Sequence, residues 1–379
     1  MEPKVLFTAS TYSHIANFHR PYLQAFSCLG WTVDVACGGA PRDIPEARRI
    51  LHLPFEKSIT APSNFRAERL LREEMRRERY TLVSAHTSLA AFFTRLAARG
   101  LDTTVVNTCH GYLFDPDAPS LKGRLLLEAE RLTAHRTDLL LTMNRRDQEI
   151  ARRYRLGRQI LPIPGMGVDF SPLDSLPSSA GTLLRGELEI PEEAFVLLYP
   201  AEFSARKNQA MLLRALALLP PDVYLLLPGN GALLDRCRAL AAELGVQDRV
   251  RFPGQVSDMG CWYQAADCAV SSSRSEGLPF NIMEAMHCSL PVAASAIKGH
   301  EDLVTPGETG FLFPSDDEET CAAQIDRLRS SPELAARLGG QARDASQPYS
   351  LEAVLPQVMA AYGAVVPALA NAGLSLSGK

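Results

Sequence analysis

The sequence predicts an α/β protein with two doubly wound domains, each built on a parallel sheet between two layers of helices. Short apolar runs alternate with amphipathic segments in both halves of the chain, which is typical of parallel strands joined by helices. The chain has 379 residues, more than one hydrophobic core usually serves. We therefore expect two domains of the same class.

Composition narrows the class of protein further. A hydrophobic content of 46% and a charged content of 22% are ordinary for a globular protein, and the net charge of −4 gives no reason to expect nucleic acid as a partner. No apolar run reaches the roughly 18 residues needed to cross a bilayer, and the start of the chain does not resemble a signal peptide. The eight cysteines form no Cys-x-x-Cys pair, so we expect reduced thiols and a cytoplasmic protein.

The first half carries five expected strands with helical segments between them. The strands are Lys4–Ser10, Thr32–Ala36, Leu82–Ala85, Thr104–Thr108 and Leu139–Met143. Helical spacing is found at Phe18–Leu29, Ala67–Arg79 and Leu121–His135. Because such sheets bind ligands at the carboxyl edge, the residues that follow each strand are the candidates for a site.

Ser13 and His14 follow the first strand, in a segment without glycine that we expect to be a loop lining a ligand cleft. We interpret His14 and His19 as loop and helix-start residues rather than catalysts. His110 and Tyr112 follow the strand that ends at Thr108, and we expect them at the same cleft. From its position alone, His110 is either a ligand contact or a histidine bonded to backbone at a strand end.

Two further segments of the first half have competing interpretations. Asp115-Pro116-Asp117 contains a proline and lacks a strand before it, so we predict a turn rather than a metal site. The helix Leu121–Leu132 carries basic residues beside leucines, which would suit an anionic membrane surface. The interleaved Glu128 and Glu130 instead favour a helix packed on its own sheet. Peripheral membrane contact stays open.

The second half repeats the alternation. Its expected strands are Phe195–Tyr199, Val223–Leu227, Val250–Phe252, Cys268–Ser273 and Leu290–Ala296. Gly229, Gly231 and Gly254 follow the second and third of these strands, where glycine permits close approach of backbone to a ligand. The tail Tyr349–Ala370 is predicted to be one long apolar helix, and Ser375–Lys379 a frayed end.

The stretch Ser275–Ala285 is the most informative part of the chain. It joins a buried strand to a helix with Pro279 at its first position, so backbone N–H groups and the positive end of a helix dipole would face a phosphate. Glu276 precedes that helix and Glu284 lies within it. Ionised carboxylates only accept hydrogen bonds, which suits sugar hydroxyls. The residue pattern equally allows Glu276 to be a helix cap and Glu284 a solvated surface residue.

Glu276 to Glu284 resembles the Glu-x7-Glu motif of retaining glycosyltransferases of family 4, which have the GT-B fold of two facing Rossmann-like domains with a cleft between them. Asn107–Phe114 resembles a Thr-x-His-Gly-Phe-x-Phe stretch of the exopolysaccharide branch, and Ile160–Asp169 is similar to the interdomain hinge. The resemblance implies an acceptor-side domain over 1–167, a nucleotide-sugar domain over 168–348 entered through a linker at Pro172–Glu193, and a terminal helix within 349–379 that rejoins the first domain.

The resemblance also implies a role for each site residue. His110 would reach the transferred sugar, Glu276 the sugar hydroxyls and Glu284 the ribose diol. The diphosphate would be bound by Lys207, by Arg206 as a second cation and by the amides of Gly277, Leu278, Pro279 and Phe280. Glu202 occupies the position where relatives have an arginine. Gly229, Gly231 and Gly254 would contact the nucleotide.

The implied activity is that of a retaining, metal-independent hexosyltransferase. It would need no cofactor beyond its nucleotide-sugar co-substrate, expected to be UDP-linked, and would act on a glycan or a polyprenyl-diphosphate-sugar at the inner face of the membrane. Two alternatives stay open. A catalytically silent relative that only binds the donor is one, favoured by Glu202 and by the missing glycines of the first loop. The other is a GT-B enzyme such as a 2-epimerase, which would need its own set of acidic and histidine residues.

Overall fold

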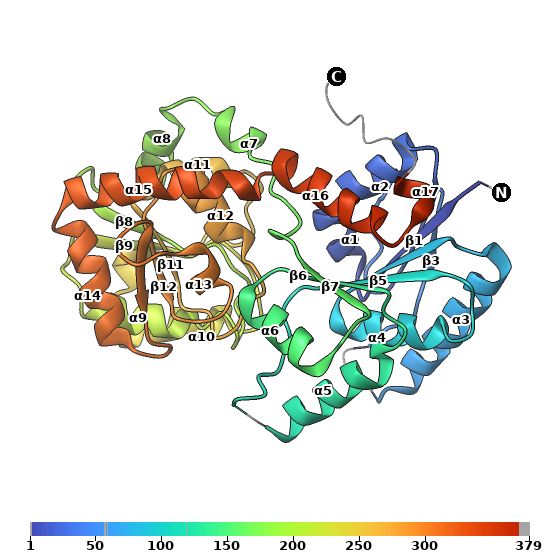
Figure 1. Cartoon of the computed structure of the whole chain (residues 1–379). Helices are drawn as coiled ribbons and strands as arrows, with labels where there is room; N and C mark the ends of the chain where they lie inside the picture. Colours follow the sequence, from blue (N-terminus) through green and yellow to red (C-terminus); the bar gives the residue numbers. More distant parts are fainter. Residues whose placement is uncertain (1, 57, 59, 119, 371–379) are drawn as a thin grey trace. The chain divides into compact units, whose positions relative to one another are not determined.

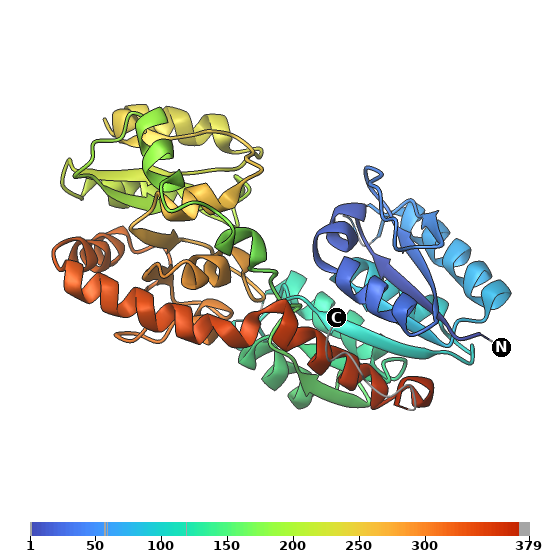
Figure 2. The same cartoon turned by 90° about the horizontal axis from the view of Figure 1, so that it is seen from above.

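The computed structural model describes residues 2–56, 58, 60–118 and 120–370. Contacts within the chain divide it into two compact units. Unit 1 comprises the chain up to Gly167 together with the residues from Glu352 onward, and unit 2 comprises Val168–Leu351. In each unit, helices cover both faces of one parallel sheet (Figure 1 and Figure 2). The α/β class predicted from the alternation of apolar runs is therefore confirmed.

The sheet of unit 1 has seven parallel strands in the order β3-β2-β1-β4-β5-β6-β7. The strands are β1 Lys4–Ala9, β2 Thr32–Cys37, β3 Arg49–His52, β4 Leu82–His86, β5 Thr104–Cys109, β6 Leu139–Thr142 and β7 Gln159–Pro162. The five predicted strands are confirmed. The sequence did not indicate β3 and β7, because these edge strands are only partly buried and carry no continuous apolar run.

The helices of unit 1 are α1 Tyr12–Phe18, α2 Arg20–Cys28, α3 Pro62–Glu78, α4 Ser88–Ala97, α5 Leu121–Ala134, α6 Arg145–Tyr154, α16 Leu351–Gly363 and α17 Pro367–Ala370. Helices α1, α2 and α16 lie over one face of the sheet, and α3, α4 and α5 over the other (Figure 1). The ring of Phe26 on α2 meets both Phe7 of the sheet and Tyr362 of α16 edge to face.

Two predictions about unit 1 are wrong. The expected loop after the first strand is helix α1, which is capped by the Thr11 side chain accepting a hydrogen bond from the His14 amide. The single tail helix predicted over Tyr349–Ala370 is instead divided into α16 and α17. The predicted end at Ser375–Lys379 lies outside the described residues.

The sheet of unit 2 has six parallel strands in the order β10-β9-β8-β11-β12-β13. The strands are β8 Phe195–Leu198, β9 Val223–Leu226, β10 Val250–Arg251, β11 Cys268–Ser271, β12 Val292–Ser295 and β13 Gly310–Phe313. Every residue of β11 and β12 is buried, as expected for strands covered on both faces.

The helices of unit 2 are α7 Ser171–Asp174, α8 Ala180–Glu187, α9 Gln209–Ala217, α10 Leu234–Glu243, α11 Met259–Gln264, α12 Phe280–His287, α13 His300–Leu303, α14 Glu318–Arg329 and α15 Pro332–Ser346, with 3-10 turns η1 Gln247–Arg249 and η2 Gln347–Tyr349. Helices α9, α10 and α14 lie over one face of the sheet, and α8, α11, α12 and α15 over the other (Figure 1). The expected linker Pro172–Glu193 is therefore not an open linker, because it contains α7 and α8.

Each sheet has one position where the strand order reverses, between β1 and β4 in unit 1 and between β8 and β11 in unit 2. Connections leave these two neighbouring strands in opposite directions, so a crevice opens at their carboxyl ends, where open α/β sheets bind ligands. The segments that follow β1, β4, β8 and β11 therefore lie where such sheets bind ligands.

Membrane spans and the state of the cysteines were also predicted from the sequence. Within the described part of the chain, no helix is long and apolar enough to cross a membrane. All eight cysteines are free thiols, and Cys37, Cys109, Cys237, Cys268 and Cys321 are buried, as expected for core residues.

Candidate functional site

The site in unit 2 is centred on Glu276, in the loop that follows β11 at the strand-order reversal. Its side chain is only 9% exposed. Oε1 accepts hydrogen bonds from Lys207 Nζ at 2.6 Å and from Ser273 Oγ at 2.6 Å. Oε2 accepts one from Arg206 Nη1 at 2.8 Å. The carboxylate is therefore turned inward at the reversal point and does not serve as a helix cap.

The charge of Glu276 depends on these neighbours. Burial by itself raises the pKa of the Glu276 carboxyl, but Lys207 and Arg206 outweigh burial, so the pKa lies below its usual value. The carboxylate is ionised at neutral pH and offers about four lone-pair sites, of which three are occupied by Lys207, Ser273 and Arg206. It keeps the capacity to accept one further hydrogen bond, such as one from a sugar hydroxyl.

Arg206 and Lys207 reach the same carboxylate because they lie in a turn, not on a helix. The turn precedes α9, and the Lys207 amide donates to the carbonyl of Ser204 at 3.1 Å. The Lys207 carbonyl accepts hydrogen bonds from Tyr199 and Ser272, both at 3.1 Å. Because the two residues are not on a helix, their neighbouring side chains can meet at one carboxylate.

Gly229, Gly231 and Gly254, which we predicted to contact the nucleotide, pack against neighbouring loops. A Cβ at Gly229 would lie 2.1 Å from the Ala201 carbonyl oxygen, and one at Gly231 would lie 2.4 Å from that of Phe203. The Gly229 amide donates to the Gly254 carbonyl at 2.7 Å. All three adopt positive φ. Loop packing thus requires glycine at Gly229 and Gly231, whereas Gly254 is favoured by its positive φ.

Helix α12 begins beside Glu276 and carries Glu284. Pro279 is the N-cap rather than the first helical residue, and it has no N–H, so it cannot donate to a phosphate as predicted. The backbone donors in this turn come from Gly277, Leu278 and Phe280. A Cβ at Gly299 would lie 2.6 Å from the Gly277 carbonyl oxygen, so the turn is held against the start of α13.

Glu284 is half-buried and does not belong to a solvated face. Its Oε2 accepts a hydrogen bond from Tyr263 Oη at 2.7 Å. Burial raises the pKa of the Glu284 carboxyl, and the bond from Tyr263 offsets part of that rise. Tyr263 therefore positions the carboxylate that we predicted to hold the ribose.

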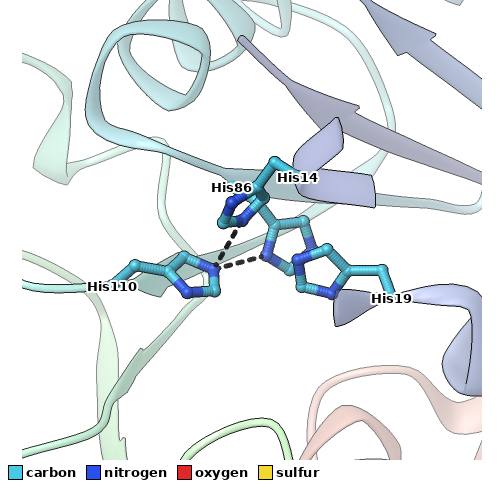
Figure 3. A group of neighbouring side chains, drawn as sticks. All are labelled: His14, His19, His86 and His110. Carbon is cyan, nitrogen blue, oxygen red and sulfur yellow. Dashed lines mark hydrogen bonds between the residues drawn. The ribbon is translucent and has the colours of Figure 1, made fainter. Parts of the chain in front are cut away.

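The site in unit 1 is a cluster of four histidines, which we call the histidine cluster: His14, His19, His86 and His110 (Figure 3). His14 Nε2 lies 3.3 Å from His110 Nε2, and His86 Nδ1 lies 3.2 Å from the same nitrogen. His19 and His86 are fully buried, whereas His14 and His110 are half-buried. The cluster lies where the order of the strands reverses in unit 1, because α1 follows β1, His86 ends β4 and His110 follows β5.

Burial determines the protonation of this cluster. It lowers the pKa of His14 to about 4, and it lowers the pKa values of His19, His86 and His110 well below the usual value, with a further contribution from neighbouring imidazoles. All four rings are neutral at pH 7. They can accept or donate hydrogen bonds but add no charge.

The remaining residues of unit 1 that the sequence singled out are Tyr112, Ser13, Asp115 and Asp117. The Tyr112 ring is 4% exposed and packs against Phe114 with ring centroids 4.9 Å apart, so we no longer expect its side chain to contact an acceptor. Ser13 is half-buried on α1, with Oγ 3.1 Å from Thr11 Oγ1. Asp115 and Asp117 form the predicted turn, and their carboxylates pair with Arg146.

Sequence reasoning missed several residues of both sites: His19, His86, Tyr199, Tyr263 and Ser273. His86 carried a signal, since it directly follows an expected strand. His19 was assigned to a helix start and excluded from chemistry, although it faces the other three imidazoles (Figure 3). The tyrosines gave no signal, because their hydrogen bonds join segments far apart in the chain.

Two family models match most of the chain. Residues 182–345 match the family "Glycosyl transferases group 1", and residues 22–169 match "Glycosyltransferase Family 4". A Bacillus subtilis (strain 168) protein named "Putative glycosyltransferase EpsD" is 33% identical over 374 residues, a match that covers 96% of this chain and 97% of that one.

Solved structures with the same fold are also known. Sucrose-phosphate synthase from Thermosynechococcus elongatus has a TM-score of 0.83 and 23% identity, over 97% of this chain and 100% of that one. Anabaena Alr3699/HepE in complex with UDP-glucose has a TM-score of 0.79 and 22% identity, over 95% and 99%. At these identities the likeness concerns the fold.

Proposed function

The chain belongs to glycosyltransferase family 4 and has the GT-B fold, and from this premise we propose that it moves a sugar from a UDP-sugar to a hydroxyl group of an acceptor, with retention of anomeric configuration. The acceptor in this proposal is a glycan or a lipid-linked sugar such as a polyprenyl-diphosphate-sugar. The structures of Anabaena HepE with UDP and with UDP-glucose support UDP as the nucleotide.

The observation that carries the proposal is the buried Glu276 carboxylate paired with Lys207 and Arg206 at the strand-order reversal of unit 2. Lys207 Nζ has three N–H donors, and its bond to Glu276 occupies one, so two remain for a diphosphate. Glu276 can accept one further hydrogen bond from the sugar. Glu284, held by Tyr263, would accept hydrogen bonds from the ribose diol.

We propose that this group needs no metal ion on the diphosphate. Negative charge develops on the departing UDP during transfer, and fixed cations and amides that face it stabilise the transition state. Lys207, Arg206 and the amides at the start of α12 supply such groups. In this proposal Glu276 and Glu284 bind the donor and are not the acid–base couple of a glycosidase.

In unit 1 we propose that His110 contacts the transferred sugar. Its ring is neutral and half-buried, and Nε2 is held by His14 and His86 at 3.3 and 3.2 Å. Nδ1 is then the nitrogen through which His110 would bond a sugar hydroxyl. His14 and Ser13 on α1 are proposed to lie beside the acceptor.

We further propose that α5 contacts the membrane that carries a lipid-linked acceptor. Leu121, Leu125 and Leu132 are 78%, 65% and 62% exposed along this helix. The two glutamates that argue against this contact are both paired, Glu130 with the buried Arg95 at 2.9 Å and Glu128 with Arg131 at 2.6 Å. An exposed leucine row flanked by basic residues suits the surface of an anionic bilayer.

The test is a transfer assay with a panel of UDP-sugars, a polyprenyl-diphosphate-sugar acceptor and EDTA throughout. The wild-type chain is expected to transfer one of these sugars, with the product in the anomeric configuration of the donor by NMR. Glu276→Gln removes the charge that orients Lys207, so we expect at least a hundredfold lower kcat/KM, about 3 kcal/mol of transition-state stabilisation. Glu243→Gln, on the exposed surface of α10, is the matched control and should retain full activity.

Other outcomes of this assay would point elsewhere. UDP binding without turnover for every donor would support a catalytically silent relative, which is favoured by Glu202, an exposed acidic residue where relatives have an arginine. Conversion of a UDP-sugar without an acceptor would support a 2-epimerase. Equal activity of Glu276→Gln and the wild-type chain would contradict the role of Glu276.

A further inference from the structure

His19 has a buried side chain whose two ring nitrogens form no hydrogen bond with the described residues. The residue is fully buried, and neither ring nitrogen has a hydrogen-bond partner among the described residues. Burial of an imidazole nitrogen without a hydrogen-bond partner costs about 1 to 3 kcal/mol of folding free energy. The ring lies against three other imidazoles, with its centroid 3.8 Å from that of His86, 5.0 Å from His14 and 5.6 Å from His110 (Figure 3).

The nitrogens of the histidine cluster have the separations of a metal-binding set. One nitrogen from each of the four rings lies within 4.8 Å of the others. Two of the separations, 3.3 Å for His14 to His110 and 3.2 Å for His86 to His110, match the roughly 3.3 Å between ligand atoms around a tetrahedral ion with bonds of about 2.0 Å. A central ion would bring the more distant nitrogens inward by rotation of the rings.

We propose that the histidine cluster of unit 1 binds one divalent transition-metal ion of the Zn²⁺ type, with His14, His19, His86 and His110 as ligands. A bound ion would give the unused nitrogen of His19 a partner. The proposal goes beyond the sugar-transfer activity and does not depend on it, because occupancy of the site is measured by metal binding itself.

The chemistry of the cluster favours this class of ion. Imidazole is a preferred ligand of Zn²⁺, Cu²⁺ and Ni²⁺, whereas Mg²⁺ and Ca²⁺ require oxygen ligands, and the cluster contains none. Neutral rings are also required, since a protonated nitrogen cannot bind a cation.

A histidine that binds a metal ion through one ring nitrogen usually forms a hydrogen bond through the other, and His86 has such a contact. Its Nδ1 faces the cluster, and its Nε2 lies 2.9 Å from Ser84 Oγ, which in turn lies 2.6 Å from Tyr362 Oη on α16. A hydrogen bond from Nε2–H to Ser84 leaves the lone pair of Nδ1 free for the ion. His14 and His110 are partly exposed to solvent.

The experiment uses the tag-free full-length chain, stripped with EDTA, then titrated with Co²⁺ and followed by visible absorption. We expect one Co²⁺ per chain with a Kd of about 1 μM or below, the strong bands of a tetrahedral ion, and displacement by Zn²⁺. X-ray absorption of the Zn²⁺ form should show nitrogen ligands at about 2.0 Å. His19→Gln and His86→Gln should each weaken binding at least tenfold.

His135→Gln is the matched control, since His135 is exposed at the end of α5 and should leave Co²⁺ affinity unchanged. Circular dichroism of each variant checks that it is folded, and if His86→Gln fails to fold, His19→Gln decides. Equal affinity in the wild-type and His19→Gln chains would overturn the proposal. So would sulfur ligands in the X-ray absorption, or no stoichiometric binding at 100 μM Co²⁺.

Discussion

Glu276 is a buried carboxylate whose ionisation depends on two cations of unequal exposure. The Lys207 side chain is 13% exposed, whereas that of Arg206 is 42% exposed. A charge pair in a buried setting is screened little by water, but a pair at the surface contributes about 1 kcal/mol or less. At the scale of single residues, Lys207 is therefore the cation that should matter for the bound diphosphate.

We predict that Lys207→Met weakens binding of UDP about tenfold or more, since a hydrogen bond to a charged group contributes about 1.5 to 3 kcal/mol. Isothermal titration calorimetry with UDP measures this. Arg206→Met removes a charge of the same sign from the neighbouring position. We expect it to weaken UDP binding about threefold or less, because the Arg206 side chain is exposed and water screens its charge. A larger loss for Arg206→Met than for Lys207→Met would contradict the assignment.

At the scale of elements, the turn between β11 and α12 is held in place by a second turn at Gly299. This residue has φ of +83°, and its Cα approaches the backbone of Gly277 so closely that no side chain fits. The amides that we assign to the diphosphate belong to the same turn. Their position is thus set by the packing of two loops rather than by the motif alone.

We predict that Gly299→Ala displaces this turn, lowers affinity for UDP at least tenfold and lowers the free energy of unfolding by about 2 to 4 kcal/mol, from the positive φ and the clash together. Urea unfolding and UDP titration measure the two effects. Gly307→Ala is the matched control, because Gly307 has φ of +80° with nothing near its missing Cβ. It should show only the smaller loss of stability, about 1 kcal/mol, with unchanged affinity for UDP. Equal affinities for the two variants would disprove the role of the contact.

At the scale of the whole molecule, stability should depend on pH through buried imidazoles. His300 in unit 2 is fully buried, donates from Nδ1 to the Ser295 carbonyl at 2.8 Å and lies 3.1 Å from Ser271 Oγ through Nε2. Burial lowers the pKa of His300 to about 4, although the Ser295 carbonyl and Glu276 act in the opposite direction and Lys207 adds to the lowering. The folded ring therefore resists protonation, while the unfolded ring accepts a proton below about pH 6.5.

The unfolded chain binds more protons than the folded chain between about pH 6.5 and 4, so stability falls as the pH falls through this range. We predict that His300 accounts for roughly 2 kcal/mol of the stability lost between pH 7 and pH 5. Urea unfolding at both values should show this loss reduced by that amount in His300→Gln. His135→Gln, with an exposed ring, should lose as much stability as the wild-type chain. A wild-type chain with equal stability at both values would contradict the prediction.

The elements themselves were largely predictable. Strands covered on both faces are rich in apolar residues, so β1, β4, β5, β8 and β11 were visible as short, mainly apolar runs. The edge strands β3 and β7 were not, because a partly exposed strand tolerates polar residues. Helix α1 was taken for a loop because the segment directly follows the first strand, whereas Thr11 caps a helix there.

The sequence by itself determined the fold class and the family, and it identified Glu276 and Glu284 as candidate residues, because apolar periodicity and a local motif are properties of neighbouring positions. Only the tertiary structure decided that Arg206 and Lys207 share one carboxylate and that His19 and His86 join His14 and His110. These side-chain contacts depend on which strands lie side by side. The reversal of strand order places β1 next to β4, and β8 next to β11, through long-range packing that no local stretch of sequence encodes.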